Sequence, residues 1–169
     1  VYNPSLEELK GIVSMTQKTM GEVANVACNA EQLLAMRETA NQIPVADEVL
    51  TFAITLISAT HPDSECASEA AKKYVRLGSS PRGGQALISA AKVLALMNGR
   101  FNVSYSDVAT LAFPVLRHRM KMNFEAIAER VSPDEVIRMI LTEVCKKCNV
   151  RLDAGILNTA ETGANKKNK

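Results

Sequence analysis

Aromatic residues are scarce in this 169-residue chain, which has no tryptophan, three tyrosines and four phenylalanines. Strands favour aromatic and β-branched side chains, whereas the helix formers Ala, Leu, Met, Glu and Lys are plentiful here. The scarcity of aromatics also removes the platforms on which unpaired bases stack in nucleic-acid-binding modules. The composition therefore predicts an almost all-α protein.

The chain also lacks an excess of charge of either sign. Twenty basic and eighteen acidic residues give a formal net charge of +2, which does not indicate a nucleic-acid or membrane protein. No apolar run reaches the roughly 20 residues of a membrane helix, and no signal peptide opens the chain. We therefore expect a soluble, cytoplasmic protein, and 169 residues can bury a core without disulfides.

Several catalytic motifs are missing as well. The phosphate-binding loop GxxxxGK[ST] is absent, and no nucleophile triad, carboxylate pair or run of metal ligands stands out. Cys145 and Cys148 have CxxC spacing without a second pair, so we expect ordinary helix-end thiols and no metal site. The chain begins with Val1 rather than Met, which we interpret as a piece of a longer chain or a processed product. By itself it is not expected to be a complete P-loop ATPase.

Helix start signals are frequent, and they divide the chain into about six helices. Most combine a capping residue with Glu, Gln or Asp three positions later. The expected starts are Ser5, Asn29, Ala46, Ser68, Ser80, Ser104 and Ser132. The first helix should end near Met20 and turn Leu6, Leu9, Ile12 and Val13 inward, and the second should carry Leu33, Leu34, Met36 and Ala40.

Three irregular features are expected along the chain. Pro114 should interrupt the helix that starts at Ser104, because a proline ring clashes with the preceding turn. Residues 120–124 are expected to extend beside residues 101–103 as a minimal two-strand pairing. The polar segment 63–76 is interpreted as a surface excursion.

The stretch Gly78-Ser79-Ser80-Pro81-Arg82 precedes the longest apolar run of the chain. Ser80 is expected to cap a helix that Pro81 opens and Gly99 ends. Gln85, Ser89 and Lys92 share one polar stripe with Arg82, which predicts that the stripe faces a cleft or a partner.

The positive end of this helix and the Arg82 guanidinium suit an anion such as phosphate, with Ser80 and Gly83 as further candidate contacts. On local chemistry alone, an ordinary surface arginine is the favoured alternative. The densest basic cluster is Arg117-His118-Arg119. It is interpreted as a solvated face or an inter-domain or inter-subunit anchor, with nucleic-acid phosphates as the alternative.

Four separated blocks resemble the C-terminal helical lid of MoxR-type AAA+ ATPases. They are residues 75–82 continuing to Gly99-Arg100, then 106–108, 112–119 and 124–126, and the likeness extends over about residues 2–141. The resemblance implies a helical lid over 1–150, entered through a linker at 1–5. Residues 151–169 lose the helical periodicity and gain Asn, Gly and Thr, so we expect a flexible tail there, which departs from the family pattern. Ala46 departs from the pattern, because a capping serine is common there.

The resemblance further implies a core upstream that holds the phosphate loop and Mg²⁺. Arg82 matches the second sensor, the lid arginine that reaches the terminal phosphates of ATP. In this family the lid couples ATP binding and hydrolysis to conformational change in a chaperone-like homo-oligomeric ring, commonly a hexamer, that acts with von Willebrand factor A domain proteins. The alternatives are a helical protein-interaction scaffold and a nucleic-acid-binding module.

Overall fold

The computed structural model describes residues 4–17, 25–153 and 155–156. It divides the chain into two compact units, residues 1–36 and 37–169. The expected limits of the lid, 1–150, remain a prediction, and most of the expected tail over 151–169 lies outside the described residues.

The first unit contains helix α1 (Leu6–Gln17) and the beginning of α2 (Ala30–Asn41). The expected capping box opens α1, since the Ser5 N–H donates to the Glu8 carboxylate over 2.6 Å and the Glu8 N–H to Ser5 Oγ over 3.3 Å. A similar exchange between Asn29 and Gln32 opens α2. The expected end of the first helix near Met20 lies outside the described residues.

Within the first unit, the apolar face of α1 is not turned inward as expected, and most of the apolar face of α2 is exposed as well. Their exposed fractions lie between 44% and 71% for Leu6, Leu9, Ile12, Val13, Leu33, Leu34 and Met36, whereas Ala40 is buried. The prediction of an inward face was wrong because an amphipathic stripe is buried only when another element covers it. Within the first unit, no described element covers the apolar face of α1.

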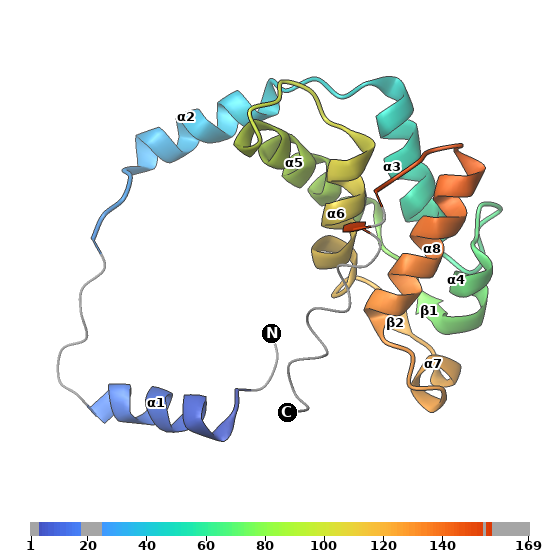
Figure 1. Ribbon diagram of the computed structural model, residues 1–169, viewed down its shortest axis with the longest axis horizontal. Helices are drawn as coiled ribbons and strands as arrows, with labels where there is room; N and C mark the ends of the chain where they lie inside the picture. The colour runs from blue at the N-terminus through green and yellow to red at the C-terminus, as the bar shows by residue number, and fades with distance from the viewer. Residues whose placement is uncertain (1–3, 18–24, 154, 157–169) are drawn as a thin grey trace. The chain divides into compact units, whose positions relative to one another are not determined.

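The second unit is built on four longer helices, α3 (Asp47–Ala59), α5 (Pro81–Met97), α6 (Tyr105–Leu116) and α8 (Pro133–Lys147). Helix α5 packs against α3 and α6, and α8 packs against α3, α6 and the short α4 (Glu69–Tyr74) (Figure 1). The largest fully buried apolar side chains come from the four longer helices: Phe52, Leu56, Leu87, Val108, Leu116, Val136, Ile137, Ile140 and Leu141. The all-α prediction is confirmed, with eight helices in the described part of the chain.

Most expected helix starts are confirmed in detail. Ser68 Oγ accepts from the Ala71 N–H at the start of α4, and capping boxes join Ser104 to Asp107 and Ser132 to Glu135. Gly99 has a φ of +67°, as expected for the left-handed residue that ends a helix. The local sequence therefore predicted these helix ends correctly.

Pro114 does not interrupt α6, which continues to Leu116. Pro114 and Thr110 are both exposed, so the carbonyl that loses its N–H partner can bind water. The flanking Phe113 and Val115 are buried, and their packing holds the helix together.

The two-strand pairing exists, but with a different partner from the one expected. Strand β2 (Lys121–Met122) pairs antiparallel with β1 (Val75–Leu77), not with residues 101–103. Asn123 extends the pairing, because its N–H donates to the Tyr74 carbonyl over 2.9 Å. A further short helix, α7 (Phe124–Ala128), begins directly after it. Pairing between such distant segments leaves no periodic signal in the sequence.

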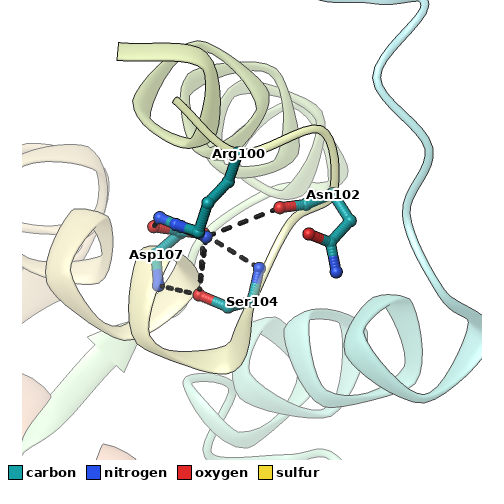
Figure 2. A network of polar contacts seen from close by, with 4 residues as sticks. All are labelled: Arg100, Asn102, Ser104 and Asp107. Atoms are coloured by element: carbon teal, nitrogen blue, oxygen red, sulfur yellow. Dashed lines mark hydrogen bonds and ion pairs between the residues drawn. The ribbon is translucent and has the colours of Figure 1, made fainter. Parts of the chain in front are cut away.

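The turn after α5 is held by an ion pair with a buried carboxylate (Figure 2). Arg100 Nη1 donates to Asp107 Oδ2 over 2.7 Å, and the same carboxylate oxygen accepts from the Ser104 N–H over 2.9 Å. Although burial alone would raise the pKa of Asp107, the hydrogen bonds from Arg100 and Ser104 hold it below its usual value. This network ties the turn after α5 to the first turn of α6.

Candidate functional site

Helix α5 begins in the expected place, but Ser80 does not cap it with its side chain. Ser80 has extended backbone angles, and its hydroxyl accepts no capping hydrogen bond. The reason is local: Pro81 has no N–H, and the Gly83 N–H donates to the Ser80 carbonyl over 2.7 Å. The expected Ser80 side-chain cap is therefore wrong, and the first turn is left without one.

Arg82 lies in this uncapped first turn and is exposed. Among the described residues its guanidinium forms no hydrogen bond or ion pair, and the first turn carries no acidic side chain. By contrast, the guanidinium groups of Arg100 and Arg117 are each held by a carboxylate. The start of α5 is therefore a positive helix end with a free cation beside it.

The polar stripe of α5 lines a groove between α3 and α5, as the sequence predicts. The groove has a volume of about 650 Å³, and Gln85, Ser89 and Lys92 form part of its wall. Its apolar wall consists of Leu50, Ala53, Ile54 and Ile57 of α3 with Ile88 of α5. Arg82 does not line the groove, so the arginine and the rest of the stripe have different surroundings.

Two residues at the end of α3 hold the loop that leads into α5. The Ser79 N–H donates to Thr60 Oγ1 over 2.9 Å, and His61 Nε2 lies 2.8 Å from the Ser79 carbonyl oxygen. Since a carbonyl can only accept, the imidazole is the donor. The sequence marks residues 61–62 only as a helix stop, so the role of Thr60 and His61 was missed.

Gly83 allows three segments to meet at the start of α5. A Cβ at Gly83 would lie 2.0 Å from Ser79 Oγ and 3.2 Å from Cδ of Arg119. Ser79 is fully buried, and its Oγ has no hydrogen-bond partner among the described residues. The predicted phosphate contacts of Ser80 and Gly83 remain predictions, and the Gly83 N–H is already engaged by the Ser80 carbonyl.

The basic cluster does not form one cationic face. Arg117 forms a bidentate pair with Asp134 at the start of α8, with Nε–Oδ1 and Nη2–Oδ2 distances of 2.6 and 2.7 Å. Arg119 donates to the Val115 carbonyl and contacts the His118 ring, while its stem packs near Gly83. The cluster thus ties the end of α6 to α8 and α5, which weakens the case for a nucleic-acid interface.

The described residues contain no group of three or more His, Cys, Asp or Glu side chains placed to hold a metal ion. Cys145 is buried and Cys148 half-buried, and both are free thiols. Burial, with a smaller contribution from Cys148, raises the pKa of Cys145 to about 11, which makes it unreactive near neutral pH. No helix in the described part of the chain is long and apolar enough to span a membrane.

Comparison with known proteins places this chain in a family. The AAA lid domain family matches residues 67–140, which include α5 and the Arg117–Arg119 cluster. Chaperone MoxR1 of Mycobacterium tuberculosis is 30% identical over 141 residues, which are 83% of this chain and 37% of that protein. The uncharacterized protein YeaC of Bacillus subtilis is 27% identical over 144 residues, covering 83% of this chain and 42% of YeaC.

A solved structure supports the same assignment. The crystal structure of a protein described as a candidate ATPase from Cytophaga hutchinsonii superposes with a TM-score of 0.66 at 27% identity, over 84% of this chain and 43% of that one. The chain thus spans about two fifths of the length of the curated relatives that it matches. The sequence blocks, the helical fold and these relatives agree, and the chain carries the AAA lid domain of a MoxR-type AAA+ protein.

Proposed function

We propose that this lid couples ATP binding and hydrolysis to conformational change in a larger AAA+ ATPase, with Arg82 contacting the terminal phosphates. The observation that carries the proposal is the exposed Arg82 in an uncapped first turn without an acidic neighbour. Because the chain has no phosphate-binding loop, the nucleotide would be held mainly by a core domain outside it. Relatives more than twice as long support such a core.

The residues at the start of α5 fit a phosphate group. Arg82 offers a planar set of donors, and the positive end of a 17-residue helix lies beside it. They do not fit Mg²⁺, because the described residues contain no acidic cluster here, so the ligands of that ion would come from the core. Bound ATP would supply the negative charge that the start of α5 leaves unmatched.

The lid would respond to loss of the γ-phosphate as one body. A charge-assisted hydrogen bond contributes about 1.5–3 kcal/mol, and most of it is lost when the terminal phosphate leaves. This difference could shift a two-state equilibrium between lid positions by about 10- to 150-fold. The shared core of α3, α5, α6 and α8 would carry the movement of α5 to the rest of the second unit.

The partners follow from the family and form part of the proposal. The AAA+ lid indicates a core domain and an oligomer, and we propose a homo-oligomeric ring, commonly hexameric in this family, that acts with a von Willebrand factor A domain protein. A chaperone role rests on the name of the Mycobacterium relative. Cross-linking and mass measurement of the full-length protein with and without ATP test the ring.

The sensor role is tested in the full-length protein with Arg82→Ala and the matched control Arg76→Ala. Both arginines are exposed, and Arg76 lies on β1, outside the first turn of α5. We expect Arg82→Ala to lower kcat/KM for ATP by about 10- to 150-fold, which corresponds to the lost bond, and Arg76→Ala to leave it within twofold. Wild-type turnover by Arg82→Ala would contradict the proposal.

A further inference from the structure

The loop Gly78–Ser80 connects β1 to α5 and determines where Arg82 is placed. It is anchored to the end of α3 through both backbone polar groups of Ser79, which belong to two successive peptide planes. The N–H of Ser79 donates to Thr60 Oγ1, and the carbonyl of Ser79 accepts from His61 Nε2. Thr60 is itself fixed, because its hydroxyl donates to the Ile57 carbonyl over 2.6 Å.

The fit around this anchor is close. A Cβ on Gly78 would lie 2.7 Å from Cγ of His61 and 2.7 Å from the Thr60 carbonyl oxygen, so only glycine fits there. Thr60 and Ser79 are both fully buried, whereas His61 is only partly buried and lines the groove between α3 and α5. The anchor thus has a buried side at Thr60 and a partly accessible side at His61.

We propose that Thr60 and His61 are positioning residues for Arg82. This inference rests on the proposed function of Arg82 and adds the residues through which that arginine is held. Ser79 is three residues before Arg82, so rotation of the two peptide planes that flank Ser79 would reorient the first turn of α5 and move the guanidinium. The same two bonds join the loop before α5 to the end of α3. A displacement of Arg82 is therefore transmitted to α3 as well as to α5.

The test uses the full-length protein and two variants of His61. His61→Phe keeps a ring of similar size but removes the donor, whereas His61→Gln keeps an N–H donor that can reach the Ser79 carbonyl. We expect His61→Phe to lower kcat/KM for ATP about tenfold, since a small misplacement of a contact group is costly. His61→Gln should stay within about threefold of wild type.

A double-mutant cycle separates positioning from a merely structural role. If His61 acts through Arg82, the double variant His61→Phe/Arg82→Ala should be no slower than Arg82→Ala alone. Multiplicative losses in the cycle would overturn the proposal, as would wild-type kcat/KM in His61→Phe. If Arg82→Ala itself is silent, the sensor role has failed and the positioning role falls with it, which is a distinguishable result.

Thr60 provides a second pair of variants in case His61→Phe does not fold. Thr60→Val removes the acceptor of the Ser79 N–H with little change in size, and Thr60→Ser keeps it. We expect Thr60→Val to lose about tenfold in kcat/KM and Thr60→Ser to lose less than threefold, with far-UV circular dichroism confirming the helices of each variant. Equal kcat/KM in the two Thr60 variants would overturn the proposal.

Discussion

Adjacent glycines in the first turn of α5 should respond in opposite ways to the same substitution. Replacing glycine by alanine inside a helix normally stabilises it by about 1 kcal/mol, because alanine loses less backbone entropy. At Gly84 the new Cβ would meet Ile57 Cγ1 at 3.5 Å, an ordinary contact. We therefore expect Gly84→Ala to raise the free energy of unfolding by up to about 1 kcal/mol.

At Gly83 the same methyl group would lie 2.0 Å from Ser79 Oγ. Ser79 cannot withdraw easily, since its side chain is fully buried and Thr60 and His61 hold its backbone. Overpacking of this kind costs about 1–3 kcal/mol. The intrinsic helix gain is common to the two variants and cancels, so Gly83→Ala should be about 1–3 kcal/mol less stable than Gly84→Ala.

Urea unfolding of the 169-residue chain, followed by far-UV circular dichroism, measures this difference, and equal m values would show that the unfolded states are comparable. Adding Ser79→Ala to Gly83→Ala should recover most of the loss, because it removes the hydroxyl that overlaps. Ser79→Ala alone should be neutral or stabilising, since that hydroxyl has no partner among the described residues. A Gly83→Ala variant at least as stable as Gly84→Ala would refute the reasoning.

Three further predictions concern charge, reactivity and capping. Asp107→Asn should lower the free energy of unfolding at neutral pH by about 1–3 kcal/mol. This difference from wild type should close as the pH falls through the depressed pKa of the Asp107 carboxyl, and urea unfolding at a series of acidic pH values measures it. Ellman's reagent at pH about 8 should modify the exposed thiol of Cys28 quickly. The buried thiol of Cys145, with its pKa of about 11, should react only on unfolding, and equal reaction rates for the two thiols would contradict the burial of Cys145. Glu143→Ala should lower the free energy of unfolding by about 1 kcal/mol in the same urea assay, because the Glu143 carboxylate accepts hydrogen bonds from two N–H groups at the start of α4. An unchanged unfolding midpoint would argue against this cap.

The parts of the site that sequence predicted correctly are those that depend on neighbours a few residues away. Pro81 and Gly99 mark the two ends of α5, and the spacing of Gln85, Ser89 and Lys92 correctly predicted a stripe along a groove. The predicted cap by the Ser80 hydroxyl was wrong, because the Gly83 N–H donates to the Ser80 carbonyl instead.

Contacts between distant segments could not be predicted in this way. The pairing of β1 with β2 and the bidentate bond from Arg117 to Asp134 join segments that only the folded chain brings together. The apolar stripe of α1 is a further example. The sequence pattern identifies the apolar face of this helix, but it does not identify an element that would cover that face.

By itself the sequence determined the helical class and most helix ends, because capping residues, proline and glycine act over three or four residues. It also determined the family likeness, because the order and spacing of the four blocks are properties of the sequence. Only the tertiary structure showed that Thr60 and His61 hold the loop before Arg82 and that Gly83 must remain small. The reason is physical: these contacts depend on how α3 and the end of α6 pack around the start of α5, and packing between distant segments is settled only when the core forms.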